Sequence, residues 1–223
     1  MRIDLLILLL ATIAQVGFAQ QTYTDKTAKE FSFKKQDLNN TVVVANINGN
    51  VKVMGYGGDV VILEIERTIN ARTVVQLEKG KHEIQLGVMD RADSLIFYLT
   101  GPCNKFGRSA KNNNRWDYEW HNCQETCREE FEYTTNFTLK VPSATQVTIC
   151  TVNNGDLIVD NVRGKVRANN INGSIKLTNL TQAAVASTIN GNLDIEYAHN
   201  PEEDCRFYSL NGDINANFQK GRC

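Results

Sequence analysis

The sequence predicts an all-β protein, a β-helix or β-solenoid with about 18 residues per coil in the C-terminal third. Three observations predict this fold: short segments that alternate apolar and polar residues, Asn-Gly turns between them, and a constant spacing of those turns. The composition agrees, because 42% hydrophobic residues with 15 glycines and 3 prolines are typical of a turn-rich globular chain. Basic and acidic side chains number 24 and 25, so the chain lacks the basic surplus that attracts nucleic acid.

Residues 1–19 are expected to form a signal peptide. Arg2 precedes an apolar run over 5–14, and Gly17 and Ala19 are small residues of the kind that signal peptidase prefers. The run is too short for a transmembrane anchor, which needs about twenty apolar residues. We therefore expect an exported protein, in the periplasm, on the outer cell surface or secreted. Its mature chain, 20–223, is expected to form one domain without a transmembrane segment.

The first half of the mature chain is expected to consist mainly of strands. The frame apolar, Asn, Gly, polar, apolar, polar, apolar appears at 47–53, and a glycine cluster at 55–58 leads into a long strand over 59–69. A short helical turn is expected within 71–80. Further strands are expected at 83–89, 94–100 and 130–141, the last of which Pro142 ends.

Residues 101–129 are expected to form a cysteine- and tryptophan-rich insertion. Its centre alternates aromatic side chains with acidic residues and a histidine, and the six candidate glycan or metal contacts are Trp116, Asp117, Tyr118, Glu119, Trp120 and His121. An aromatic row could stack on sugar rings, and carboxylates beside an imidazole could bind a metal or exchange protons. We prefer the simpler interpretation that the aromatic residues pack the insertion onto the body and the acidic residues face water.

The strongest signal is a repeat in the last third of the chain. The frame recurs at 171–177 and 189–195, and the glycines at 155, 173 and 191 are 18 residues apart. The step to Gly212 is 21, with 200–203 as the place of the extra residues, and half-period copies occur at 162–168 and 180–186. We attribute the glycine of each frame to a positive φ at a corner.

This even step predicts which residues lie above one another. Residue i should stack on residue i+18, so that two columns face inward, Leu157 with Ile175 and Leu193, and Val159 with Leu177 and Ile195. Lys176 and Asp194 should lie side by side on the outer face.

The six cysteines are expected to form disulfides, because an even number in an exported chain favours bridges. Cys205 and Cys223 are one coil apart and should pair. The other four leave two pairings open, Cys103–Cys123 with Cys127–Cys150, or Cys103–Cys127 with Cys123–Cys150. A zinc site from Cys103, His121, Cys123 and Cys127 is the less favoured alternative, because its spacing is poor. We therefore expect no metal and no cofactor.

Motifs of common enzyme classes do not occur in the sequence. It contains no Gly-x-Ser-x-Gly elbow, phosphate-binding glycine loop or His-Glu-x-x-His, and His82 and His199 are far apart. Four acidic residues of the repeat could line a groove for polysaccharide cleavage, but solvated outward positions explain them better; they are Asp156, Asp160, Asp194 and Asp213.

The signal peptide, the segments 47–56 and 59–61, and the ladder over 153–216 together resemble the bacterial putative-adhesin family of exported β-solenoid domains of unknown function. This resemblance covers most of the mature chain. It implies a β-helical fold and export, and it assigns no catalytic or binding residue. We expect a non-enzymatic envelope or cell-surface protein, an adhesin-like scaffold for protein or glycan contacts. The alternative is a carbohydrate-active enzyme with acidic residues on a coil face or in the tryptophan-rich insertion.

Overall fold

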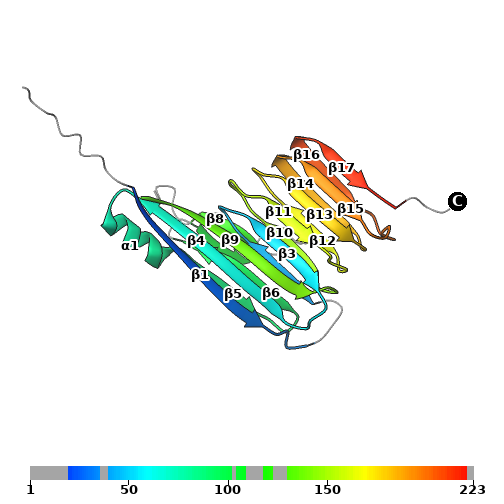
Figure 1. Cartoon of the computed structure of the whole chain (residues 1–223), viewed down its shortest axis with the longest axis horizontal. Helices are drawn as coiled ribbons and strands as arrows, with labels where there is room; N and C mark the ends of the chain where they lie inside the picture. The colour runs from blue at the N-terminus through cyan, green and yellow to red at the C-terminus, as the bar shows by residue number, and fades with distance from the viewer. Residues whose placement is uncertain (1–19, 36–39, 102–103, 109–117, 123–129, 220–223) are drawn as a thin grey trace, which may run out of the picture.

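The structure is a computed structural model that describes residues 20–35, 40–101, 104–108, 118–122 and 130–219 (Figure 1). The expected signal peptide lies outside these residues. The described part forms two large sheets, a two-stranded hairpin and one helix. Within it, no helix is long and apolar enough to cross a membrane.

The strands of each sheet follow one another in a spatial order that differs from their chain order. The eight-stranded sheet runs β1 (Gln21–Phe31), β4 (Val61–Ala71), β9 (Phe131–Pro142), β3 (Val51–Tyr56), β11 (Leu157–Asp160), β13 (Ile175–Leu180), β15 (Leu193–Tyr197) and β17 (Ile214–Asn217). The seven-stranded sheet runs β16 (Arg206–Asn211), β14 (Ala184–Asn190), β12 (Val166–Asn169), β10 (Gln146–Cys150), β2 (Thr41–Ala45), β6 (Ser94–Thr100) and β5 (Gln85–Asp90). The hairpin joins β7 (Asn104–Arg108) and β8 (Tyr118–Asn122).

The β-solenoid prediction is wrong, although the all-β class is confirmed. The chain forms two mixed sheets, in which β1 pairs antiparallel with β4, β4 with β9, and β5 with β6. The long strands β1, β4 and β9 do not carry the Asn-Gly frame, and they pair as antiparallel ribbons that an 18-residue coil cannot contain. The strands of the repeat occupy only one end of each sheet.

The predicted 18-residue register is confirmed where parallel strands of the repeat pair. Leu157 pairs with Ile175 and Ile175 with Leu193, and all three side chains are fully buried. Lys176 and Asp194 are register partners as predicted, although no ion pair joins them. The half-period copies supply β12 and β14 of the opposite sheet, so each 18-residue step contributes one strand to each sheet.

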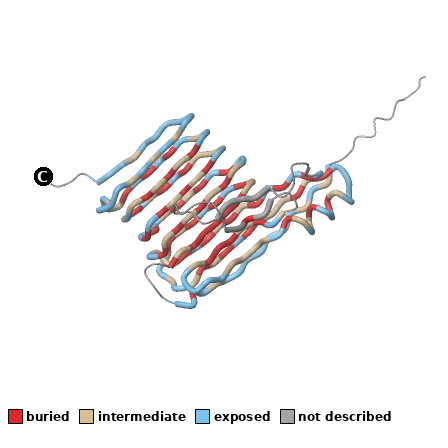
Figure 2. The backbone as a smooth tube through the Cα atoms, turned by 180° about the vertical axis from the view of Figure 1, so that it is seen from behind, coloured by how far each residue is buried: buried red, intermediate tan, exposed pale blue. Residues whose placement is uncertain are grey.

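One hydrophobic core lies between the two sheets (Figure 2). Alternate residues of most strands in the two sheets enter it, as the pattern of period two requires; examples are Val42 and Val44 in β2, and Val51 and Val53 in β3, all fully buried. The opposite residues of each strand face outward. The sequence pattern therefore fixes which side chains reach the outer faces of the two sheets.

The helix α1 (Val74–Glu83) takes the place of the expected helical turn at 71–80. The Thr73 side chain caps its start by accepting a hydrogen bond from the Gln76 amide at 3.2 Å. Leu77 and Gly80 are buried, and Gly80 lies close to Ile69 and Phe131. The helix sits at the opposite end of the molecule from β16 and β17 (Figure 1).

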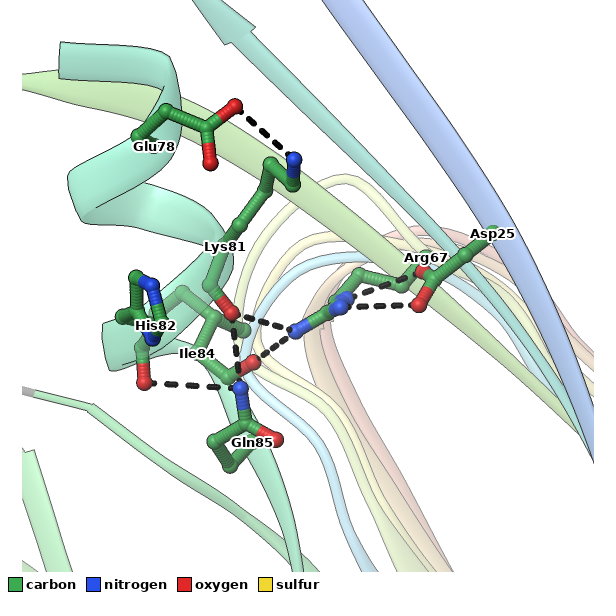
Figure 3. A network of polar contacts seen from close by, with 7 residues as sticks. All are labelled: Asp25, Arg67, Glu78, Lys81, His82, Ile84 and Gln85. Carbon is green, nitrogen blue, oxygen red and sulfur yellow. Dashed lines mark hydrogen bonds and ion pairs between the residues drawn. The ribbon is translucent and has the colours of Figure 1, made fainter. Parts of the chain in front are cut away.

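Arg67 of β4 joins β1 to the end of α1 (Figure 3). Its guanidinium group donates to both carboxylate oxygens of Asp25, at 3.0 and 2.8 Å, and also to the backbone carbonyls of Lys81 and Ile84. Only 15% of the Arg67 side chain is exposed. The planar guanidinium group thus donates hydrogen bonds to the carbonyl groups at the end of α1 and holds the edge strand β1 in place.

We expect Arg67→Lys to lower the free energy of unfolding by about 1–3 kcal/mol, because an ammonium group cannot bond to the carboxylate and the two carbonyls together. Denaturant unfolding measures this loss. Glu66→Gln is the matched control, since Glu66 forms an exposed pair with Lys26 at 3.2 Å, and such pairs contribute about 0–1 kcal/mol. Equal stability of Arg67→Lys and wild type would contradict the role of Arg67 in joining β1 to α1.

Candidate functional site

The structure describes only part of the predicted site in the insertion. Trp116 and Asp117 lie outside the described residues, whereas Tyr118 to His121 belong to β8, where Glu119 is opposite Gly107 and His121 is opposite Lys105. Their roles as glycan or metal contacts stay predictions. Within the described residues, no three His, Cys, Asp or Glu side chains are grouped to hold a metal ion.

The insertion packs against the body through Phe106, a residue that the sequence analysis did not single out. Phe106 is 8% exposed and stacks on Tyr98 with ring centroids 5.1 Å apart. It joins a small second core on the outer face of the seven-stranded sheet, with Val43, Ala45 and Ile96. The hairpin therefore covers the part of this face above β2 and β6.

The structure shows no disulfide among the described residues. Cys150 and Cys205 do not pair with each other. The other four cysteines, which include the expected partners of both, lie outside the described ranges, so the pairings stay predictions. Burial raises the pKa of the Cys150 thiol to about 12, although a backbone hydrogen bond from Asn46 opposes the shift. The Cys205 sulfur lies 2.9 Å from the Tyr197 hydroxyl, and burial, followed by this hydrogen bond, raises the pKa of Tyr197.

Two acidic residues of the repeat are engaged in contacts between neighbouring strands. Asp156 accepts a hydrogen bond from the Ser174 amide at 2.8 Å, and Asp160 accepts from Thr178 at 2.7 Å and from Asn179 at 2.8 Å. These contacts tie one layer of the repeat to the next.

A groove of about 1160 Å³ lies on the outer face of the seven-stranded sheet, beyond the part that the hairpin covers. Strands β10, β12, β14 and β16 form its floor. The segment before β16 forms a wall. The residues that line it are Gln146, Val147, Thr148, Lys165, Val166, Arg167, Ala183, Val185, Glu202, Glu203, Asp204 and Arg206.

The floor is a row of outward-facing residues in register across four strands. Thr148 pairs with Arg167, Arg167 with Val185, and Val185 with Arg206. The core takes the alternate positions of these strands, including Val166, Ala168, Ala184 and Ala186, which leaves the row on the outer face. Arg167 is half-buried, Arg206 is exposed, and within the described residues neither guanidinium group has a hydrogen-bond or ion-pair partner.

A second outward row runs beside the first. Cys150 pairs with Asn169, Asn169 with Ser187, and Ser187 with Tyr208. The Ser187 hydroxyl donates to the Asn169 side-chain oxygen at 2.9 Å, and Tyr208 is 56% exposed. Tyr208 stands two residues after Arg206 on the same face of β16, so an aromatic ring flanks the cationic row.

The acidic wall of the groove comes from the longer step of the repeat. Val185 pairs with Arg206, which is 21 residues later, so the three additional residues fall in the segment before β16, as the sequence predicted. Glu203 in this segment forms an ion pair with Lys165 at 2.7 Å. Glu202 and Asp204 are exposed beside it.

The sequence analysis did not identify this groove. Aligning the repeat frames does place Arg167, Val185 and Arg206 at equivalent outward positions. This shared position is the sequence signal from which the row could have been predicted. As candidate site residues of the repeat, the sequence analysis considered only the acidic ones, which it interpreted as solvated. The groove also requires the wall, whose position depends on how the longer segment folds back.

Comparisons with known proteins give distant matches only. No protein-family model and no curated protein matches the chain. A putative cell adhesion protein from Clostridium sporogenes ATCC 15579 has a similar structure, with a TM-score of 0.39 and 9% identity over 87% of this chain and 99% of that one. A putative adhesin from Bacteroides fragilis NCTC 9343 gives 0.23 and 12%, over 86% of this chain and 97% of that one. A putative lipid binding protein from Parabacteroides distasonis ATCC 8503 gives 0.26 and 9%, over 86% and 96%.

Proposed function

We propose that the protein is a non-enzymatic, exported envelope or cell-surface protein of adhesin-like type, and that the outer face of its seven-stranded sheet binds glycans. One observation carries this proposal. An exposed aromatic ring, Tyr208, lies beside rows of amide, hydroxyl and guanidinium groups on a rigid sheet that borders a groove.

The chemistry of these groups matches that of a sugar surface. A sugar ring has an apolar face that packs on an aromatic ring, and hydroxyl groups around its edge that exchange hydrogen bonds. Asn169 and Ser187 supply both donors and acceptors, and their mutual hydrogen bond fixes their orientation. Because the floor residues belong to paired strands, little backbone order is lost on binding.

The test is binding of the exported chain to a glycan array, together with an assay for newly formed reducing ends. We expect binding without cleavage, and we expect Tyr208→Ala to weaken binding about tenfold or more, since the ring supplies the stacking surface. Val75→Ala is the matched control, because Val75 is 79% exposed on α1, remote from the groove.

Three results would overturn the proposal. They are an array on which no glycan binds, an equal loss of binding in Tyr208→Ala and Val75→Ala, and release of reducing ends from any bound glycan. Far-ultraviolet circular dichroism of both variants establishes that each one is folded before binding is compared.

A further inference from the structure

We infer that the groove takes acidic oligosaccharides and that Arg167 and Arg206 bind their carboxylate groups. This inference rests on the proposed function and narrows it to one class of glycan. It is carried by two guanidinium groups that share one row, face the same groove and have no partner within the described residues.

The spacing of the two arginines suits a ligand longer than one sugar. Val185 of β14 separates them, so their backbones are two strand spacings apart, ~9.6 Å. Two uncharged residues of the same row lie next to the arginines: Val185 stands between them, and Thr148 stands on the other side of Arg167. An oligosaccharide lying across the strands would present carboxylates to both arginines and its ring faces to the floor and Tyr208.

Arg167 and Arg206 have no bonding partner in the part of the chain that the structure describes, whereas Arg67 does. Arg67 is fully engaged by Asp25 and by two carbonyl groups, as structural arginines usually are. Arg167 is half-buried without such a partner, so its guanidinium group is available to pair with a ligand in the groove. A guanidinium group binds a carboxylate through two parallel hydrogen bonds, which makes arginine well suited to this class of ligand.

Among the described residues, the acidic wall forms no ion pair with the two arginines of the floor. Three acidic residues of the wall, Glu202, Glu203 and Asp204, line the groove with three basic ones, and an ion pair joins Glu203 to Lys165. Glu202 and Asp204 remain on the wall without bonds to either arginine. Their repulsion should keep a polyanion close to the floor and weaken its binding, so Glu202→Gln with Asp204→Asn is expected to increase affinity.

The experiment is calorimetric titration of the exported chain with oligogalacturonate, oligoalginate and sialyllactose, each beside its methyl ester. We expect at least one acid to bind, and its uncharged ester to bind about tenfold more weakly. Arg167→Gln and Arg206→Gln should each reduce binding of the acid by about tenfold and leave binding of the ester unchanged. Added salt should weaken binding of the acid.

Arg72→Gln is the matched control, because Arg72 is an exposed arginine at the helix end of the molecule. If acids and esters bind equally, or if the Arg167 and Arg206 variants bind like Arg72→Gln, the inference is overturned. In that case a loss of binding in Tyr208→Ala would still support the glycan proposal. If no acid binds while neutral glycans bind on the array, the inference fails alone, and if no glycan binds, both proposals fail.

Discussion

Replacing Gly173 with alanine is expected to lower the free energy of unfolding by about 2–5 kcal/mol, because two costs combine at this position. The φ angle of Gly173 is +148°, which disfavours a residue with a side chain. A Cβ atom there would also lie 2.0 Å from the carbonyl oxygen of Gly155 in the preceding layer of the repeat. That oxygen belongs to the backbone of a paired layer, so it cannot move away without disturbing the register.

Urea unfolding of three variants separates the two costs. Gly191→Ala is expected to lose less than Gly173→Ala, since its Cβ would lie 2.1 Å from the Gly173 oxygen but its φ is not positive. Gly57→Ala should be nearly neutral, because no heavy atom lies within 4 Å of a Cβ built there. A midpoint for Gly173→Ala equal to that of Gly57→Ala would show that the layers do not touch at this corner.

These corner glycines also correct part of the sequence analysis. A positive φ was expected at each frame glycine, and Gly49, Gly173 and Gly212 have one. Gly155 and Gly191 do not, yet a Cβ on either would lie within 2.1 Å of the preceding frame glycine's oxygen. Close stacking of successive corners is thus the requirement that the frame glycines share, and a single frame viewed alone does not reveal it.

The repeat was predictable because it combines two periods. Alternation at period two identified the inward columns, and the 18-residue step identified their neighbours, as the pairs of Leu157, Ile175 and Leu193 show. The antiparallel part has no such internal period. The pairing of β1 with β4, and the position of β9 between β4 and β3, depend on contacts between segments far apart in the chain. Alternation predicts the strands there without specifying their partners.

The candidate site was harder to predict than the strands that form it. The sequence analysis placed its candidate site in the tryptophan-rich insertion, because an unusual composition can be recognised from the sequence alone. The groove instead combines ordinary residues from four strands, such as Thr148, Arg167 and Val185, with a wall from the segment before β16. Only the register brings the two arginines onto one row.

A second feature that the sequence analysis missed is a set of buried and half-buried polar residues beside the corner glycines. Asn170, Thr188 and Ser209 each stand three residues before a frame glycine, and each donates to the carbonyl oxygen of the frame glycine in the preceding layer. The donors change from amide to hydroxyl while the acceptor stays the same. Each of these glycine oxygens thus has a side-chain donor from the next layer.

Asn170→Ala is expected to lower the free energy of unfolding by about 2–4 kcal/mol, because it leaves the buried Gly155 carbonyl and the part-buried Ile171 amide without their partner. The Asn170 side chain donates to the Gly155 oxygen and accepts from the Ile171 amide, both at 2.8 Å, and the residue is 5% exposed. Asn190→Ala is the matched control. It also removes two hydrogen bonds, to Asn172 at 2.7 Å and from Asn211 at 2.8 Å, but on an exposed residue where water replaces them.

Urea unfolding of the two asparagine variants therefore compares equal numbers of lost hydrogen bonds in a buried and an exposed setting. We expect a loss of about 1 kcal/mol or less for Asn190→Ala, and an unchanged dependence on urea concentration for both. The amide of Ile171 should also exchange faster with solvent in Asn170→Ala, since it is the donor left without an acceptor. Equal losses in the two variants would mean that the corner is open to water and that the buried asparagine does not hold successive layers together.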